Sequence, residues 1–209
     1  MTRLVLVRHG ETEWNSDAVY RGRANVELSA AGKHQAEALA HRFAGRDIAF
    51  LGAGPLTRAR DTARVIAESN GIELHIVGEL NDLDCGEWQG LSDVQVKERY
   101  PELRWQWHTA PQTVTLPGGE SLSDVESRVV DLLRRIRDIE GTVLLVSHRV
   151  VLKVMVCKLL GLDNSHFWDI RVDLAGTTEF DCSASRTVLV RHNDVSHLSQ
   201  ANGAVPPDF

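Results

Sequence analysis

The segment LVLVRHG, residues 4–10, decides the fold class of this chain. Four apolar residues in a row, Leu4–Val7, are typical of a strand buried on both faces of a parallel sheet. Arg8 and His9 follow the strand immediately, and Gly10 permits a sharp turn after them. The segment therefore predicts a polar pair at the carboxyl end of a buried strand, where ligands bind in sheets of this kind.

Five further strands are expected after this one. We place them at residues 48–51, 74–77, 142–146, 177–180 and 187–190. The last two are expected to form a hairpin around Ser183–Ser185. Strands that alternate with helices predict an α/β fold. The architecture we expect is a three-layer sandwich, with a mostly parallel central sheet, helices on both faces and an antiparallel C-terminal edge.

Four helices are expected from apolar periodicity and from signals at their ends. The first begins at Ser29 and stops at Gly45, the second has a cap at Thr57, and the third begins with a capping box of Ser123 and Glu126. The fourth follows Ser147-His148-Arg149 and runs through Leu160. Residues 81–120 show no comparable periodicity, so we expect an irregular segment there.

The composition, with 43% hydrophobic residues, fits a single globular domain over residues 1–209. The formal net charge of -6 argues against nucleic-acid or anionic-membrane partners, which call for a broadly basic surface. Three widely spaced cysteines indicate a reduced intracellular protein without a CxxC metal pattern. Because the sequence shows neither a leader pattern nor an apolar run of about 18 residues, we expect a cytoplasmic protein.

The tetrapeptide LVRH occurs twice, at residues 6–9 and again at 189–192. Ligands of an open α/β sheet bind beyond the carboxyl ends of its strands. His9 follows the first strand and His148 follows another fully apolar strand, so we expect these two histidines to converge at one edge. The second LVRH lies in the expected hairpin, and we expect His192 at the opposite edge.

Several segments, in order along the chain, resemble the histidine phosphatases of the phosphoglycerate mutase type. The segments are LVRHGETEWN (6–15), GPLTRARDTA (54–63), ELNDLDCGEWQG (79–90), GGES (118–121), VLLVSH (143–148) and a tail of HFWDIRVD (166–173) with HNDVSHL (192–198). The chain is thereby identified as a member of this family, in its phosphatase subgroup. It is most similar to metal-independent phosphoserine and broad-specificity phosphatases, and in that tail His192 is a non-catalytic strand end.

The resemblance implies a phosphomonoester hydrolase that needs no metal or cofactor and acts on a small phosphorylated metabolite. His9 would be the nucleophile and would become a phosphohistidine. Arg8, Arg58 and His148 would bind the phosphoryl oxygens. Substrate binding is further expected from Thr12, Asn15, Arg21, Gly22 and Arg149. The partner expected is the phosphoester alone, and a homodimer is left open.

The family's acid/base carboxylate falls on Asp82, counting back from Gly86, where Glu is usual. The Asp carboxylate lies one methylene further back, roughly 1.3 Å, and misplacement of about that size can cost on the order of 10²-fold in rate. Three interpretations stay open: Asp82 serves, Glu79 or Asp84 takes the proton instead, or the enzyme is impaired. If burial raises the pKa of Asp82, a bell-shaped rate profile on the acidic-to-neutral side follows.

Other features leave further alternatives. Arg21 and Arg149 either add charge to the rim of the pocket, for a substrate with a second anionic group, or are solvated surface arginines. In the family, a lid-like insert covers the substrate, and here it falls at about residues 91–117. Trp105 and Trp107 therefore either form an aromatic wall for the substrate or only pack the insert onto the body.

Two rival functions share the resemblance. One is a 2,3-bisphosphoglycerate-dependent phosphoglycerate mutase, although such mutases usually carry a longer insertion than Leu91–Pro117. The other is a catalytically impaired relative that binds a phosphorylated ligand or partner protein. Only Asp82 supports the impaired relative, because the remaining expected catalytic residues are intact.

Overall fold

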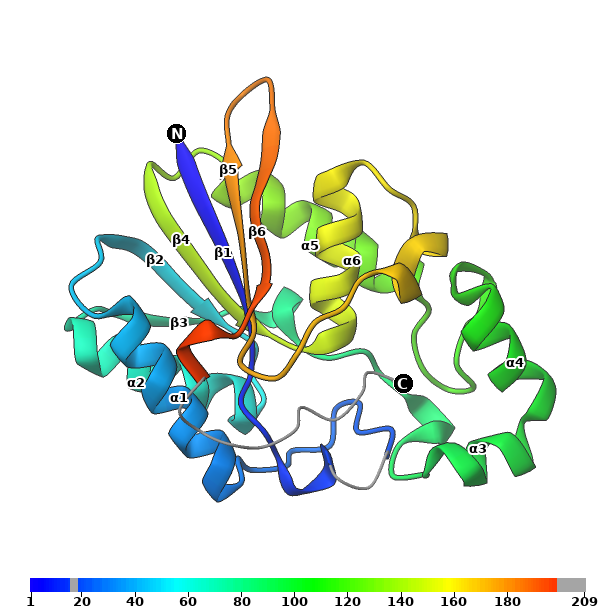
Figure 1. The fold of residues 1–209 in the computed structure, drawn as a ribbon. Coiled ribbons are helices and arrows are strands. Elements are labelled where there is room, and N and C mark those ends of the chain that lie inside the picture. The colour runs from blue at the N-terminus through cyan, green and yellow to red at the C-terminus, as the bar shows by residue number, and fades with distance from the viewer. Residues whose placement is uncertain (16–18, 199–209) are drawn as a thin grey trace.

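The computed structural model describes residues 1–15 and 19–198 and is built on a six-stranded sheet (Figure 1). In spatial order the strands are β3 (Leu74–Ile76), β2 (Ile48–Ala53), β4 (Gly141–Ser147), β1 (Thr2–Arg8), β5 (Thr177–Cys182) and β6 (Thr187–Asp194). The first four run parallel, β5 runs antiparallel to β1, and β6 runs antiparallel to β5. The expected α/β class is confirmed, including its antiparallel C-terminal edge.

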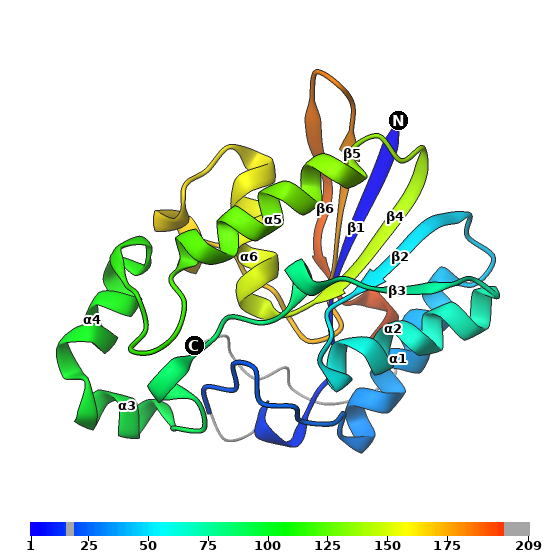
Figure 2. The same ribbon diagram turned by 180° about the vertical axis from the view of Figure 1, so that it is seen from behind.

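Four long helices cover the two faces of the sheet. One face carries α1 (Ala30–Phe43) and α2 (Thr57–Asn70), and the other carries α5 (Leu122–Ile136) and α6 (Arg149–Leu160), as Figure 1 and Figure 2 show. Successive side chains of a strand point to opposite faces. Leu4 and Leu6 of β1 therefore pack on the α5 and α6 side, whereas Val5 and Val7 pack against α1 and α2. This burial on both faces accounts for the unbroken apolar run.

The starts of α1 and α2 depend on side chains in different ways. The helix α1 begins after Ser29, where a start was expected, and Ser29 caps it, because its hydroxyl accepts from the Gly32 N–H at 3.1 Å. The prediction of a Thr57 cap for α2 is wrong, since Thr57 is the first residue of the helix. The Oδ1 atom of Asn25 accepts from the Thr57 N–H at 2.8 Å. A side chain from a distant loop therefore acts at this helix start, which no local pattern reveals.

The predicted capping box of α5 lies two residues too late in the chain. Ser121 is the cap, and it forms the box with Asp124 rather than Ser123 with Glu126. Asp at this position replaces the more usual Glu or Gln. Glu126 instead accepts from Lys158 of α6 at 2.9 Å. Ser121 and Ser123 each stand three residues before an acidic residue, so the sequence pattern alone does not distinguish the two positions.

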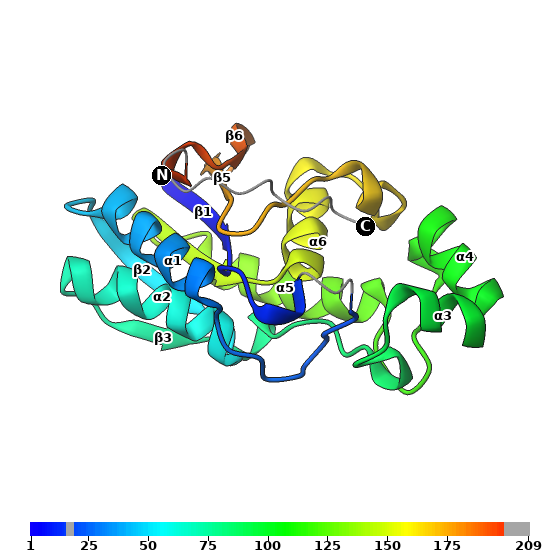
Figure 3. The same cartoon turned by 60° about the horizontal axis from the view of Figure 1, so that its bottom comes forward.

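Residues 91–117 contain two short helices that the sequence did not predict. They are α3 (Asp93–Arg99) and α4 (Pro101–Thr109). Each is too short for a clear apolar stripe. They lie on the α6 side of the molecule, away from α1 and α2 (Figure 3). The expectation of an irregular segment is therefore wrong for this part of residues 81–120.

The two tryptophans of the insert have different surroundings. Trp107 is 3% exposed and meets Trp88 and Trp168 edge-on, with ring centroids 6.4 and 6.1 Å apart. Trp105 is 64% exposed. Packing of the insert onto the body therefore accounts for Trp107.

Within the described residues, short 3-10 turns connect the longer elements. They are found at Glu13–Asn15, Gly78–Leu80, Gly86–Trp88, Pro111–Thr113, Asn164–Asp169 and Ser196–Leu198. No helix in the same described part of the chain is long and apolar enough to cross a membrane.

The hairpin of β5 and β6 is confirmed, but the expected position of His192 is wrong. Two successive antiparallel pairings restore the direction of β1, so β6 ends at the same edge of the sheet as β1. His192 is nevertheless separated from β1 by β5, and its Nδ1 lies 3.2 Å from the Thr178 hydroxyl. The second LVRH therefore lies within the edge strand β6, with β5 between it and β1.

Candidate active site

The two histidines converge because β1 and β4 are neighbours in the sheet. Their parallel register pairs Arg8 with Ser147, so His9 and His148 leave adjacent strands at the same edge. The His9 N–H donates to the Ser147 carbonyl at 3.0 Å. The two imidazole centroids are 5.2 Å apart, and the residues are 2% and 1% exposed. The expected convergence is present in the structure.

His9 is fixed in one tautomer and held neutral. Its Nδ1 lies 2.7 Å from the Gly10 carbonyl, which can only accept, so Nδ1 carries the proton. The other ring nitrogen, Nε2, then presents a lone pair. Burial lowers the pKa of His9 well below its ordinary value, and the positive charges of Arg58 and Arg8 act in the same direction. A neutral imidazole with an available lone pair is a nucleophile.

Arg58 is the second residue of α2 and is fully buried. Its guanidinium makes four hydrogen bonds within the protein. The acceptors are His148 Nδ1 at 3.2 Å, the Ala24 carbonyl at 2.7 Å, the Gly22 carbonyl at 2.8 Å and Asp82 Oδ2 at 2.8 Å. A guanidinium has five N–H groups, so about one is left for a ligand. Arg58 therefore holds His148 and Asp82 in place, in addition to the phosphate-binding role expected from the resemblance.

The bond from Arg58 also sets the tautomer of His148. Because Nδ1 accepts from Arg58, a neutral ring carries its proton on Nε2. That Nε2 is buried and has no hydrogen-bond partner among the described residues. Burial lowers the pKa of His148 to about 3, although the nearby Asp82 carboxylate opposes the shift. His148 is therefore a neutral donor whose N–H awaits an acceptor.

Asp82 is 8% exposed, and both of its carboxylate oxygens are engaged. Oδ1 accepts from the Leu83 N–H at 2.9 Å and Oδ2 accepts from Arg58. Burial raises the pKa of Asp82, but His148, Arg58 and the Leu83 N–H together hold it below its ordinary value. The expectation that burial raises the pKa of Asp82 is therefore wrong for the unliganded protein. The neighbouring hydrogen-bond donors and positive charge outweigh the effect of desolvation.

The other two candidate carboxylates lie elsewhere. Glu79 pairs with Arg135 on the outer side of α5. Asp84 accepts from Arg23 at 3.2 Å and from the Gly86 N–H at 3.0 Å. Of the three acids weighed from the sequence, Asp82 is the one that contacts Arg58 and lies 3.6 Å from His148.

Arg8, Thr12 and Asn15 are all buried around the first histidine. Arg8 Nη1 donates to the Val172 carbonyl at 2.6 Å, which anchors the guanidinium. Asn15 Oδ1 accepts from both the N–H and the hydroxyl of Thr12, at 2.8 and 2.7 Å. These bonds commit the Asn15 oxygen to the protein and leave its amide nitrogen as the donor for a ligand.

Arg21 and Arg149 stand close enough for their charges to interact. Arg21 Nη1 donates to the Trp14 carbonyl at 3.1 Å, and the Arg149 guanidinium lies 6.0 Å from the Trp168 ring centroid. Burial, followed by repulsion from Arg149, lowers the pKa of Arg21 to about 10. Both residues are partly buried, so neither is a fully solvated surface arginine. Gly22 contributes its carbonyl, which accepts from Arg58.

The sequence analysis missed several residues that support the site. Thr62 of α2 accepts from the Gly10 N–H at 3.0 Å and donates to the Arg58 carbonyl at 2.8 Å. It therefore links the turn after His9 to α2. The others are Arg23, Glu120, Arg128 and Ser147, which bind the loop that carries Asp82. Thr62, Glu120 and Ser147 lie inside the quoted segments, but a segment match alone says nothing of their contacts.

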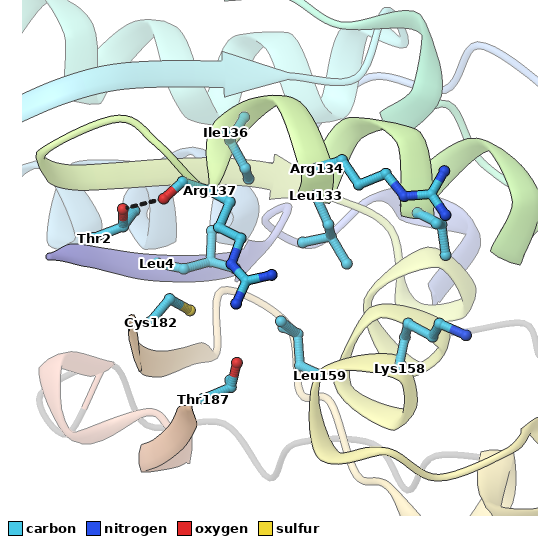
Figure 4. A pocket seen from close by; sticks show the side chains of 11 residues that line it. Thr2, Leu4, Leu133, Arg134, Ile136, Arg137, Lys158, Leu159, Cys182 and Thr187 are labelled. Carbon is cyan, nitrogen blue, oxygen red and sulfur yellow. Dashed lines mark hydrogen bonds between the residues drawn. The ribbon is translucent and has the colours of Figure 1, made fainter. Parts of the chain in front are cut away.

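A hollow of about 210 Å³ lies at the other end of the sheet (Figure 4). Thr2, at the start of β1, and Cys182 line it, whereas His9 comes after the end of β1. Its Arg134 pairs with Asp131, and burial raises the pKa of the Cys182 thiol. Without an imidazole or an activated thiol, this hollow has no group suited to phosphoryl transfer.

The chain is a member of the histidine phosphatase superfamily, whose branch 1 family model matches residues 4–195. Phosphoserine phosphatase 1 of Hydrogenobacter thermophilus is 36% identical over 202 residues, 96% of each chain. The adenosylcobalamin/alpha-ribazole phosphatase of Escherichia coli is 30% identical over 173 residues, 82% of this chain and 85% of that one. The family expected from the sequence is therefore confirmed.

Solved structures show the same likeness. A mycobacterial glucosyl-3-phosphoglycerate phosphatase, solved with VO3, superimposes with a TM-score of 0.84 at 30% identity. The match covers 91% of this chain and 98% of that one.

Proposed function

We propose that this protein hydrolyses phosphomonoesters of small metabolites through a phosphohistidine on His9, without a metal ion. The observation that carries the proposal is the state of His9. Its ring is neutral, its Nδ1 proton is held by the Gly10 carbonyl, and cationic or N–H donor groups of Arg8, Arg58 and His148 surround it. A phosphoryl group bound by those donors would face the Nε2 lone pair.

The first half of the reaction transfers the phosphoryl group to His9. The Nε2 lone pair forms the N–P bond while the P–O bond to the leaving group breaks. Charge that develops on the phosphoryl oxygens is stabilised by Arg8, by the His148 Nε2–H and by the Asn15 amide. Asp82 gives a proton to the departing oxygen, which leaves as the alcohol.

The second half returns the enzyme to its starting state. A water oxygen attacks phosphorus, the N–P bond breaks, and Asp82 takes a proton from the water. Inorganic phosphate leaves and carries away the proton that the substrate brought, so Asp82 is again ionised and His9 is again a neutral imidazole. The same carboxyl therefore acts first as acid and then as base.

Asp82 must gain a proton before it can act as the acid. In the unliganded site it is ionised, since Arg58 and its other partners lower its pKa. A phosphate anion bound at Arg58 and His148 adds negative charge beside the carboxylate, and a like charge raises the pKa of an acid. Substrate binding thus prepares Asp82 for proton transfer, and a second phosphate pKa of about 6 lets the substrate bring that proton.

The test is to trap the phosphoenzyme in the presence of EDTA with a radiolabelled phosphomonoester. Label should attach to the wild type, survive base and be lost in acid, as expected of a phosphohistidine. His9→Ala should take up none. His192→Ala is the matched control, because it alters the second LVRH, and it should label as the wild type does. Labelling of His9→Ala, or loss of activity with EDTA, would contradict the proposal.

The substrate class rests on the relatives, two of which are named for phosphoserine and alpha-ribazole phosphatase activities. We infer a small phosphomonoester for this chain as well. A panel that includes phosphoserine and 3-phosphoglycerate, assayed for phosphate release, should rank the candidates. Conversion of 3- to 2-phosphoglycerate that depends on 2,3-bisphosphoglycerate would favour the mutase instead.

A further inference from the structure

The loop that carries Asp82 is held by side chains from other elements. Each backbone carbonyl of residues 79–82 accepts a hydrogen bond from such a side chain. Arg128 of α5 donates through Nη1 to the Glu79 and Asn81 carbonyls, the latter at 2.7 Å, and through Nη2 to the Asp82 carbonyl at 3.2 Å. Ser147, at the end of β4, donates to the Leu80 carbonyl at 2.8 Å.

Arg128 is itself fixed in place. Its Nη2 lies 3.3 Å from Glu120 Oε2, and its side chain is 17% exposed. The same Glu120 oxygen accepts from the Asp84 N–H at 2.9 Å, on the far side of Asp82. Arg23 donates to the other Glu120 oxygen at 2.8 Å. One guanidinium and one carboxylate thus hold the main chain on both sides of Asp82.

The position of the Asp82 carboxyl depends strongly on this main chain. Aspartate has only one methylene between its backbone and its carboxyl, so it has little freedom to correct a displaced loop. The carboxyl has to remain 2.8 Å from Arg58 and close to His148. A displacement of about 1 Å in a reacting group can cost on the order of 10²-fold in rate.

We propose that Arg128 is a positioning residue for proton transfer, because it fixes the backbone that places the Asp82 carboxyl at the reacting centre. The inference rests on the proposed function, in which Asp82 is the general acid. Arg128 touches neither Arg58 nor His148 through a hydrogen bond; it acts on three carbonyls of the loop, in a fork geometry that a lysine cannot reproduce.

The test compares two substrates that differ in their need for a proton. An alkyl phosphomonoester has a poor leaving group that requires the acid, whereas 2,4-dinitrophenyl phosphate has a leaving group that departs as the anion. The quantity measured is kcat/KM, which reports only the steps up to release of the leaving group. Arg128→Met should lower kcat/KM for the alkyl substrate on the order of 10- to 100-fold, with little change for the dinitrophenyl substrate.

Three companion variants make the result specific. Asp82→Asn should show the same dependence on the leaving group, and Arg128→Met in the Asp82→Asn background should add little, since residues that act as a unit are not additive. Arg134→Met is the matched control on α5, because Arg134 is an exposed arginine paired with Asp131. It should leave both substrates unchanged.

The outcomes separate the two proposals. If Asp82→Asn slows both substrates equally, Asp82 is not the acid and that part of the proposed function fails. If Asp82→Asn discriminates between the substrates and Arg128→Met slows both equally or neither, the positioning role of Arg128 is wrong. Should Arg128→Met not fold, Arg128→Lys keeps the charge and loses the fork, and it must show the same discrimination for the proposal to stand.

Discussion

The Arg58 guanidinium donates from Nη2 to the Asp82 Oδ2 atom at 2.8 Å, with Arg58 fully buried and the Asp82 side chain 12% exposed. A buried cation that lies beside both histidines therefore already holds the carboxyl that would protonate the leaving group. Each charge compensates the other while the site is empty. An anionic substrate changes that balance, because it brings a second negative group to the same cation.

Loss of Arg58 should destabilise the protein more than loss of Asp82. Arg58→Met leaves the buried Asp82 carboxylate without its cation, which costs about 3–5 kcal/mol when one partner of a buried pair is removed. Asp82→Asn should cost less, because Arg58 keeps the Gly22 and Ala24 carbonyls as acceptors. Urea unfolding at pH 7 measures both changes in the free energy of unfolding.

Two further variants test whether the charge pair causes this effect. Arg58→Met combined with Asp82→Asn should be more stable than Arg58→Met alone, because the stranded charge is gone. On the same helix, Arg64→Met removes an exposed partner of Asp61 and should change stability by no more than about 1 kcal/mol. A double variant as unstable as the sum of its parts would show that the pair is not coupled.

His9 should remain a neutral ring with its proton on Nδ1 well below pH 6.5. Burial and the positive charges of Arg58 and Arg8 lower its pKa, and the Gly10 carbonyl fixes the tautomer. Because the neutral form is the nucleophile, acidification to pH 6 should not remove it. Nitrogen NMR of the imidazoles, with His9→Ala to assign the signal, measures this directly. A His9 signal that titrates at an ordinary histidine pKa of about 6.5 would contradict the assignment.

The two buried histidines should make folding stability fall as soon as the pH drops below 6.5. In the unfolded chain a histidine takes up a proton there, whereas in the folded protein burial lowers the pKa of His148 to about 3 and lowers that of His9 as well. The unfolded state then binds more protons, so stability is complete above pH 6.5 and is lost on acidification. Each histidine contributes up to about a tenfold change in the folding constant per pH unit.

Urea unfolding of the wild type from pH 8 to pH 5 checks this dependence. His148→Gln removes one of the protons and should flatten the slope between pH 6.5 and pH 5. The slope should not vanish, because burial also lowers the pKa of His9 and, in part, of His108, His192 and His197. Asp82 does not interfere in this range, because its pKa is held below the ordinary carboxyl value and its contribution is lost only at lower pH. A wild-type stability that is constant over the whole range would rule out buried neutral histidines.

The sequence predicted the central strands of the sheet and the convergence of the two histidines that follow β1 and β4, for a clear physical reason. Leu4–Val7 and the β4 segment are apolar on both faces, so they must be central strands, and the residues that follow neighbouring parallel strands meet at one edge. Pairing of His9 with His148 across 139 positions followed from that rule. The family segments then named Arg58 and Asp82.

The contacts between those residues could not be predicted in the same way. The lowered pKa of Asp82 depends on a guanidinium from α2, and the support of its loop depends on Arg128 binding backbone carbonyls. Carbonyl acceptors are the same at every residue, so such bonds leave no pattern in the sequence. The direction of β6 was also missed, because it depends on two reversals counted from β1 rather than on any local signal.

Gly86→Ala should destabilise the protein and loosen the Asp82 loop, because a Cβ at Gly86 has no room. Gly86 has φ +49°, and an added Cβ would lie 2.1 Å from the Pro117 carbonyl oxygen and 2.6 Å from the Gly119 nitrogen. These atoms belong to the main chain of residues 117–119, which cannot move aside as a flexible side chain would. Gly90 is the matched control: its φ is +81°, but an added Cβ would meet nothing within 4 Å.

Gly90→Ala should therefore show only the cost of a positive φ, about 1 kcal/mol, and keep its activity. Gly86→Ala should lose clearly more stability in urea unfolding. Any folded fraction should also hydrolyse an alkyl phosphomonoester more slowly, because Gly86 joins the loop that carries Asp82 to the turn before Glu120. The Glu87 N–H, which donates to the Pro117 carbonyl at 2.8 Å, marks that junction. Equal losses of stability for the two variants would mean that φ strain alone, and not this close backbone contact, sets the requirement for glycine.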